Sequence, residues 1–448
     1  MKHDAVIRSS LDHFFQITRR HSTIPREISA GLTIFGSMAY IMAVNPAVLA
    51  GAGLARHDMI MTTIAGAVAG TLLMALWARL PIALAPAMSS NVLFAQVVVQ
   101  QAHVSPSTAF TVVLFSGTCF TLLSLTRLRL KIIQSFPPCI ILGIQTAIGA
   151  FIARIGLISA GIAVPSAGGL GFASLSHPAV ILALAGVMFC LLLQLLRIPA
   201  GLLVTIMVLT LAGLVVPGPD GQALTQLPGH LIDWPHYPVN MLAPFDFHEF
   251  FQHLGLLLPI TLYILLSDFF DATGTMLTVT RQAGLCGTRE QPDLPPRAFA
   301  ADGAASIIGA LLGTCTVSAY LESLTGAEAG GRTGLSALVV ALLFALSCFF
   351  WPLITAIPAL ATAPVLVFVG IIMLSNLTEL PDNLEESFPP LCMVLLTVVT
   401  GSFMLALACG MLLYTAMLLI RRAFHKVTPV IICLDIIFLC YMILQGRF

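Results

Sequence analysis

The chain has 448 residues, of which 58% are apolar and only 9% are charged, and its formal net charge is zero. Soluble domains carry charge on about a quarter of their residues, so this composition excludes an ordinary soluble protein and indicates a membrane protein. Apolar runs such as "ILALAGVMFCLLLQLL" recur along the whole chain, each close to the roughly 20 residues that cross a bilayer. We expect no nucleic-acid partner.

The N-terminal segment, residues 1–27, is basic and has a mixed polar and apolar face. It contains no signal-peptide core or cleavage site, and it is typical of a cytoplasmic amphipathic start. Its basic residues are Lys2, Arg8, Arg19, Arg20 and Arg26.

Fourteen membrane segments are predicted after this start, in two sets of seven separated by the polar loop 217–253. The first set is 28–50, 58–79, 82–99, 107–126, 132–155, 177–196 and 200–216. The second set is 254–275, 298–314, 316–330, 334–352, 357–377, 388–401 and 402–421. A further apolar stretch, 428–446, either spans the membrane, lies on its surface or packs against the bundle.

Basic residues orient the chain, because they are enriched in cytoplasmic loops. The loop 217–253 has no Lys or Arg, which predicts that it lies outside the cell membrane and that the N-terminus is cytoplasmic. The residues predicted on the inner side are Arg79, Arg127, Arg129, Lys131, Arg197, Arg281, Arg289, Arg297, Arg421, Arg422 and Lys426.

An odd number of crossings in each set predicts two repeats of opposite orientation, 28–216 and 254–448. Weak sequence similarity between the halves supports this, and it places Asn91 opposite Glu322. The third and tenth segments, "PIALAPAMSSN" and "TCTVSAYLES", are short and rich in small and polar residues. Interrupted segments at matching places in two halves indicate the binding site of a transporter near the middle of the membrane.

Two carboxylates lie inside the eighth segment, in "LLSDFFDATGTML". On a helix Asp268, Asp271 and Thr275 fall within about 60° of one another and share one face. A charged Asp at a helix centre costs at least about 2.5 to 3.5 kcal/mol, so the pair needs a cavity, a partner or a proton. The alternative is that Asp271 caps a helix break with Thr273 and Gly274, and that Asp268 bonds nearby backbone.

Two other polar residues lie in the interrupted segments. Glu322 follows a β-prone stretch, and we expect it to bond backbone amides at the start of a half-helix, unless it lies at a helix end near water. Asn91 either lines the site or bonds a neighbouring helix.

Two motifs of soluble enzymes are nearly present. "GAEAGGRT", residues 326–333, has Arg332 where a phosphate-binding loop has Lys, and neither a strand-loop-helix unit nor a Mg²⁺ partner surrounds it, so it predicts a turn. "HEFFQH" misses the zinc pattern because His248 and His253 are five residues apart, and it predicts an ordinary loop. The ten cysteines are single and mostly apolar in context, so we expect neither disulfides nor a metal site.

Four stretches together identify a family. They are "STIPREISAGLTIFGSMAYIMAVNPAVL", "LPIALAPAMSSNVLFA", "SDFFDATGTMLTVTRQAGL" and "TVSAYLESLTGAEAGGRTGLSALVVALLF". In order and spacing they resemble the AzgA-like guanine/hypoxanthine permeases, a branch of the nucleobase:cation symporters with the uracil/xanthine permease fold. The chain departs from the family's usual "APGMGLN" at Ala87, Ser89 and Ser90.

This resemblance implies an all-α membrane protein of fourteen segments in two inverted repeats, with a core and a gate domain and short strands in segments three and ten. It implies a transporter, not an enzyme, that imports a purine base by proton symport across the inner membrane, with a homodimer as one possible assembly. The implied substrate-binding residues are Asn91, Asp268, Glu322, Ser90 and Ala319, with Asp271 and Glu322 for proton coupling or core support. The only cofactor expected is the proton.

Three alternatives remain from the residues themselves. The same architecture carries other small solutes, such as another nucleobase or an organic anion. An intramembrane aspartyl protease also uses two membrane aspartates, but it takes them from separate helices, whereas Asp268 and Asp271 share one. The third alternative is a sensor that does not transport.

Overall fold

The computed structural model describes residues 10–126, 137–166, 169–173, 177–196, 198, 200–218, 222–286, 294–424 and 427–445. Nine helices in this part are long and apolar enough to cross a membrane, as the composition predicts for a membrane protein of many helices. Several residues used for the predicted orientation lie outside the described part: Lys2, Arg8, Arg127, Arg129, Lys131, Arg197, Arg289 and Lys426.

Each predicted segment corresponds to a helix or to a strand followed by a helix. The elements of the first half are α2 (Ile24–Met38), α3 (Ile41–Leu49), η1 (Ala50–Ala52), α4 (Arg56–Leu73), η2 (Met74–Ala78), β1 (Leu84–Pro86), α5 (Met88–Val92), η3 (Leu93–Gln101), α6 (Pro106–Ser124), α8 (Pro138–Ser159), β2 (Ala163–Ser166), β3 (Gly169–Phe172), α9 (Pro178–Leu195) and α10 (Gly201–Ala212). The boundaries proposed for the two repeats stay a prediction.

The second half of the chain begins with the polar loop and contains one strand, β4, in its described residues. Its elements are η4 (Val239–Met241), α11 (Phe247–Gln252), α12 (Leu254–Gln282), α13 (Pro296–Leu311), β4 (Val317–Ala319), α14 (Ser323–Glu328), α15 (Gly334–Ser347), η5 (Cys348–Phe350), α16 (Trp351–Thr355), α17 (Ala359–Ser375), η6 (Asn376–Glu379), α18 (Leu384–Thr400), α19 (Phe403–Ile420) and α20 (Pro429–Gln445). The stretch 428–446 is thus helical where it is described, and it packs against α12 and α19.

Proline and hydroxyl residues explain where many helices begin. Proline occupies the first turn of α2, α6, α8, α9 and α13, where its missing N–H costs no hydrogen bond. Ser105, Thr333 and Ser402 each accept a backbone N–H at the start of α6, α15 and α19. Proline and hydroxyl residues therefore mark where helices begin in a sequence that is mostly apolar.

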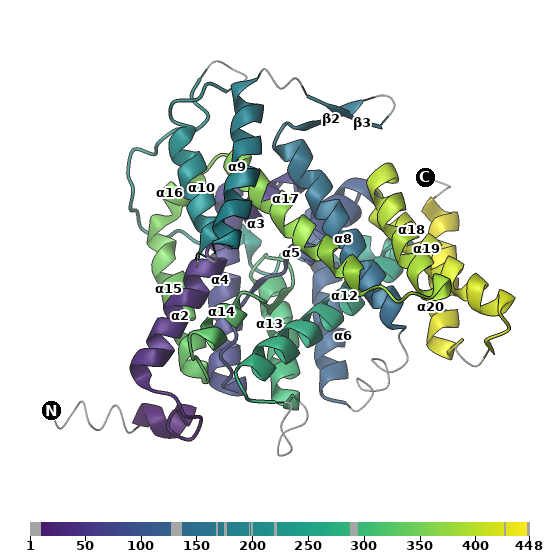
Figure 1. Cartoon of the computed structure of the whole chain (residues 1–448), viewed down its shortest axis with the longest axis horizontal. Coiled ribbons are helices and arrows are strands. Elements are labelled where there is room, and N and C mark those ends of the chain that lie inside the picture. The colour runs from purple at the N-terminus through teal and green to yellow at the C-terminus, as the bar shows by residue number, and fades with distance from the viewer. Residues whose placement is uncertain are drawn as a thin grey trace.

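The helices pack in two groups. The core group consists of α2–α6 and α12–α16, in which α13 packs on α4 and α6 and α15 packs on α2 and α4. The gate group consists of α8–α10 and α17–α19, in which α17 crosses α8 (Figure 1). Gly149 and Gly370 lie at that crossing, where a Cβ on Gly370 would be 2.5 Å from the Gly149 carbonyl oxygen. Small residues allow such close approach of membrane helices.

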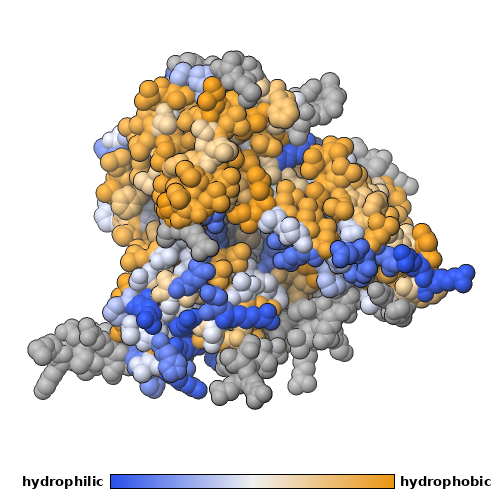
Figure 2. Space-filling model, in the orientation of Figure 1, coloured by the Kyte–Doolittle hydropathy of each residue, from blue (hydrophilic) through white to orange (hydrophobic). Residues whose placement is uncertain are grey.

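The distribution of apolar and hydrophilic side chains over the surface is the one expected of a protein that spans a membrane. Figure 2 shows apolar side chains over the upper part of the molecule and over the helices near the C-terminus, and hydrophilic side chains gathered at the end where the N-terminus lies. Exposed apolar residues on α9 include Met188, Leu191 and Leu195. Such a surface suits lipid contact and does not suit water.

Strand β4 fits into the core group because glycines surround it. A Cβ on Gly309 of α13 would lie 2.7 Å from the Cys315 carbonyl oxygen and 2.7 Å from a methyl of Val317. We expect Gly309→Ala to lower the free energy of unfolding by about 1 to 3 kcal/mol through overpacking. Gly274→Ala in α12, where a Cβ meets nothing within 4 Å, should leave stability unchanged or raise it. Thermal unfolding of the purified proteins compares the two, and equal stability of both variants would contradict this packing.

The short helix α11 is tied to the start of α6 by Glu249. Its carboxylate accepts the Ser105 N–H, the Ser105 hydroxyl at 2.5 Å and the Thr108 hydroxyl. Burial raises the pKa of Glu249, but these donors outweigh burial and hold the pKa below its usual value. The stabilisation is therefore present above the usual Glu pKa of about 4.3 and is lost as the pH falls through the lower folded value. We expect Glu249→Gln to reduce thermal stability at pH 7 and to converge with wild type at acidic pH.

Candidate functional site

The two interrupted segments meet as a pair of short antiparallel strands buried in the core group. Leu84 pairs with Ala319, Ala85 with Ser318 and Pro86 with Val317. The alignment that sets Asn91 opposite Glu322 also sets Pro86 opposite Val317, and these two residues are partners in the ladder. The pairing therefore has the register expected of two related half-chains in opposite orientation.

Side chains from neighbouring helices satisfy the outer edges of the two strands. The Thr71 hydroxyl accepts the Leu84 N–H at 2.9 Å and donates to the Leu84 carbonyl at 2.7 Å. The Ser306 hydroxyl donates to the Val317 carbonyl at 3.0 Å, and the Ser323 hydroxyl accepts the Ala83 N–H at 3.0 Å. Strand edges within a membrane need such partners because no water solvates them.

Asp302 holds β4 from α13, the helix that also carries Ser306. Its carboxylate accepts the Ala319 N–H at 2.8 Å and the Ser318 hydroxyl at 3.1 and 3.2 Å, and its side chain is fully buried. The Ala319 side chain is almost fully buried opposite Leu84. A buried carboxylate that accepts from two donors of one strand fixes that strand firmly, so Asp302 positions the backbone that flanks the site.

The two aspartates of α12 face the helix that follows β1. The Ser90 hydroxyl donates to Asp268, which is 2% exposed. The Ser89 hydroxyl donates to Asp271 at 3.2 Å, and the Gln145 amide of α8 donates to its other oxygen at 3.4 Å. Helix α12 is unbroken through this region, so the alternative of a helix break capped by Asp271 is wrong.

Gln145 belongs to the gate group and Asp271 to the core group, so this hydrogen bond crosses between the two groups. The region between the strands, α12 and α8 is therefore the place where core and gate meet around ionisable groups. A carrier that exposes its site to alternate sides of the membrane needs such a contact to break and reform.

Asn91 lies next to the strand pair and has a free acceptor. Its amide nitrogen donates to the Pro86 carbonyl at 3.4 Å, and the Tyr320 hydroxyl donates to the same carbonyl at 2.6 Å. The side-chain oxygen of Asn91 is buried and has no partner in the structure. The alternative that Asn91 only bonds a neighbouring helix is wrong, because its one bond lies within its own segment.

Glu322 stands at the first position before α14, but its side chain does not bond the backbone amides of that helix. The prediction of a helix-capping carboxylate is therefore wrong. The carboxylate accepts the Tyr40 hydroxyl at 2.6 Å instead. Tyr40 lies at the junction of α2 and α3, where it is 2% exposed, so Glu322 is bound to the first half of the chain.

Several residues of this region were not predicted from sequence. Asp302, Gln145 and the tyrosines lie in runs where polar side chains are few, and an isolated intramembrane carboxylate or amide is itself an indication of function. The residues missed are Tyr40, Ser89, Gln145, Asp302 and Tyr320.

The two near-motifs have structural roles. "GAEAGGRT" forms the end of α14 and a turn, as predicted, and the buried carboxylate of Glu27 accepts the Arg332 N–H at 2.8 Å and the Thr333 N–H at 3.2 Å there. "HEFFQH" was predicted to be an ordinary loop, but most of it forms the short helix α11, whose Glu249 carboxylate binds the start of α6. The described residues contain no cluster of three or more His, Cys, Asp or Glu side chains that could hold a metal ion.

The fold and these buried, paired polar groups define a polytopic membrane transporter. The transmembrane domain of a cyanobacterial bicarbonate transporter, BicA, has the same fold, with a TM-score of 0.61 and 18% identity over 85% of this chain and 96% of that domain. The structure of SLC26A9 also gives a TM-score of 0.61, at 14% identity, over 95% of this chain and 70% of that one. At these identities the likeness concerns the fold alone.

The chain belongs to the Permease family (Xan_ur_permease), whose model matches residues 25–409. It is 35% identical to the guanine/hypoxanthine permease PbuO of Bacillus subtilis, over 95% of this chain and 98% of that one. It is 32% identical to the adenine permease AdeP of Escherichia coli, over 96% and 95%. These relatives confirm the resemblance to guanine/hypoxanthine permeases, and all are named as permeases, not as enzymes.

Proposed function

We propose that this protein imports a purine nucleobase by proton symport across the inner membrane, with its N-terminus in the cytoplasm. Family membership carries the proposal, because the relatives named above are guanine/hypoxanthine and adenine permeases. The arrangement of Asp268, Asp271 and Glu322 around the strand pair supports it from the chemistry.

A purine base presents ring N–H groups, and some bases add an exocyclic amine, which are donors that carboxylates accept strongly. The Ser90 hydroxyl donates to one oxygen of Asp268, and a ligand N–H is a further donor that suits this carboxylate. The unpartnered oxygen of Asn91 offers a second acceptor nearby. In this proposal Asp268 and Glu322 hold the base, with Asn91 beside them.

Proton coupling requires a carboxylate whose protonation favours binding or movement. Asp271 joins the core group to Gln145 of the gate group as an acceptor, so its protonation alters that contact. We assign to Asp271 the role of linking proton uptake to movement of the core group. Glu322, which accepts from Tyr40, is the second group for this role.

Two of the three residues at which this chain departs from the family pattern contact the site aspartates directly. Ser89 and Ser90 donate to Asp271 and Asp268, and therefore they change how many carboxylate lone pairs remain for a ligand. We expect Ser90→Ala to change the preference among hypoxanthine, guanine and adenine, while the amount of protein in the membrane stays close to that of wild type. Competition by each unlabelled base against labelled hypoxanthine measures this preference.

The experiment that tests the function is uptake of radiolabelled hypoxanthine, guanine and adenine by cells that lack their own purine carriers. Uptake that depends on this protein and is abolished by a protonophore supports proton-driven purine import. Absence of uptake of every purine, in cells whose membranes contain the protein, would indicate another small solute or a sensor.

A further inference from the structure

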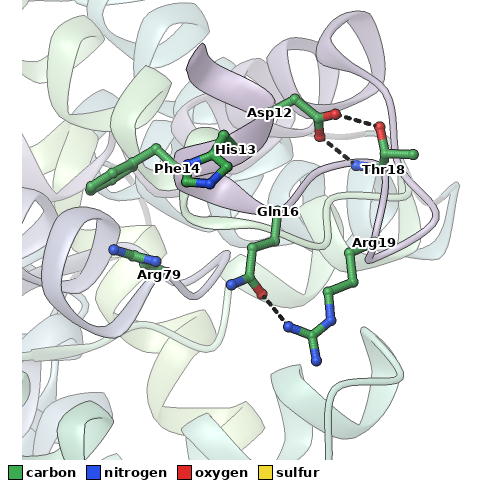
Figure 3. Close-up of a pocket in the computed structure, with 7 residues that line it drawn as sticks. All are labelled: Asp12, His13, Phe14, Gln16, Thr18, Arg19 and Arg79. Carbon is green, nitrogen blue, oxygen red and sulfur yellow. Dashed lines mark hydrogen bonds between the residues drawn. The ribbon is translucent and has the colours of Figure 1, made fainter. Parts of the chain in front are cut away.

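A cavity of about 510 Å³ lies between the N-terminal segment and Arg79, and none of its lining residues belongs to the strand pair (Figure 3). The segment is held in place because Phe15 and Ile17 are buried against Leu335 of α15. The cavity is lined by Asp12, His13, Phe14, Gln16, Thr18, Arg19 and Arg79. Its volume is within the range of pockets that bind small ligands.

The cavity has more positive than negative side chains that are available to a ligand. Asp12 is the one carboxylate of the lining, and it accepts the Thr18 N–H and the Thr18 hydroxyl, each at 2.7 Å. These two bonds, the backbone one first, hold the pKa of Asp12 below its usual value. The Arg19 guanidinium makes only a long bond, 3.5 Å, to Gln16, and the ion pairs found in the described residues include neither Arg19 nor Arg79.

Contacts hold Arg79 at one side of the cavity, and one nitrogen of its side chain has no hydrogen-bond partner in the structure. Its backbone is in the left-handed region, with φ of 57°, and its carbonyl accepts from Arg20 at 2.6 Å. Its guanidinium lies 4.3 Å from the centre of the Phe14 ring, and its Nε is buried without a partner in the structure. Burial is the main cause that lowers the pKa of Arg20; the charge of Glu27 acts against it, and the positive charges of Arg79 and Arg19 add to the lowering. Arg19 and Arg79 are therefore near enough to Arg20 for like charges to interact.

We propose that this cavity binds a phosphate compound, with Arg79 beside Phe14 and Arg19 on the other side of Gln16 as the positive groups that face it (Figure 3). Guanidinium groups match phosphate oxygens in charge and geometry. The phosphate belongs either to a free phosphate compound or to the headgroup of an anionic phospholipid, which is abundant at the cytoplasmic surface of membranes. The proposal does not depend on which solute the protein transports.

The test uses the full-length protein in nanodiscs of net-neutral lipid, at constant ionic strength. Inorganic phosphate is titrated, and the midpoint of thermal unfolding is followed by tryptophan fluorescence. A second set of nanodiscs contains phosphatidylglycerol. We expect a saturable rise of the midpoint with phosphate, with phosphatidylglycerol, or with both. A rise with phosphate alone identifies a free compound as the source, and a rise with phosphatidylglycerol alone identifies a lipid headgroup.

Arg19→Gln is the informative variant, because Arg19 makes no bond on which the fold depends. We expect it to weaken phosphate binding about tenfold, in line with the loss of a charged hydrogen bond, and Arg79→Gln to weaken it at least as much. Arg281→Gln, at the exposed end of α12, is the matched control and should bind like wild type. No saturable response in either kind of nanodisc, or equal weakening by Arg281→Gln, would overturn the proposal.

Discussion

Replacing Asp268 by Asn is expected to reduce purine uptake by about a hundredfold while the protein still reaches the membrane. Asn keeps the shape of Asp268 but loses its charge, and a hydrogen bond to a charged group contributes about 1.5 to 3 kcal/mol. The loss of charge also removes a group that can carry a proton. Because Asp268 is 2% exposed and bonded to Ser90, no water replaces the lost interaction. Initial rates of labelled hypoxanthine uptake, normalised to protein in the membrane, measure the effect.

Asp435→Asn provides the matched control for this prediction. Asp435 is also a buried aspartate of an apolar helix, but it lies on α20, outside the strand pair. Its replacement should leave uptake within about twofold of wild type, because Asp435 is neither in the strand pair nor among the residues bonded to Asp268, Asp271 and Glu322. If Asp268→Asn and Glu322→Gln both transport with unchanged proton flux, these residues neither hold the base nor couple the proton.

Asp302→Ala is expected to lower the free energy of unfolding by about 3 kcal/mol and to abolish stabilisation by purine. The change leaves the buried Ala319 N–H and the Ser318 hydroxyl without their acceptor. An unsatisfied buried polar group costs about 1 to 3 kcal/mol, and more where the lost partner is charged. Without Asp302, β4 is held on that side only by the Ser306 bond to Val317. Thermal unfolding of the purified variant, with and without hypoxanthine, measures both effects.

Ser318→Ala separates the role of the strand backbone from that of the hydroxyl. This variant removes the hydroxyl donor but keeps the bond from the Ala319 N–H to Asp302, so we expect a loss of about 1 kcal/mol. Purine should still stabilise it. Equal stability of Asp302→Ala and Ser318→Ala would show that Asp302 does not hold the strand.

The parts of the fold that follow from local sequence were predictable. Long apolar runs require helices in lipid, and these correspond to the observed elements. The two interrupted segments, which contain Pro86 and Ser318, were also recognisable. They are short and rich in small and polar residues, unlike an ordinary membrane helix. Asp268 and Asp271 were predicted as site residues, because two carboxylates in an apolar membrane segment are costly unless they have partners, a proton or a cavity.

The partners of these residues were not predictable, because they come from distant parts of the chain. Gln145 reaches Asp271 only through the packing of α8 beside α12, and Tyr40 reaches Glu322 across the two halves. Asp302 was not predicted, because it is a single carboxylate in its segment and only the fold brings it to the Ala319 N–H and the Ser318 hydroxyl. Glu322 was expected to cap α14, but the Tyr40 hydroxyl is the donor that binds it.

Binding of hypoxanthine to the purified protein tests the central claim most directly, since it requires neither a membrane gradient nor transport. Isothermal titration of wild type, Asp268→Asn and Asp435→Asn at neutral pH compares the site aspartate with a buried aspartate elsewhere. We predict saturable binding by wild type and by Asp435→Asn, and none by Asp268→Asn at the same concentrations. Binding that Asp268→Asn retains in full, or a folded wild-type protein that binds no purine, would contradict a purine site beside the strand pair.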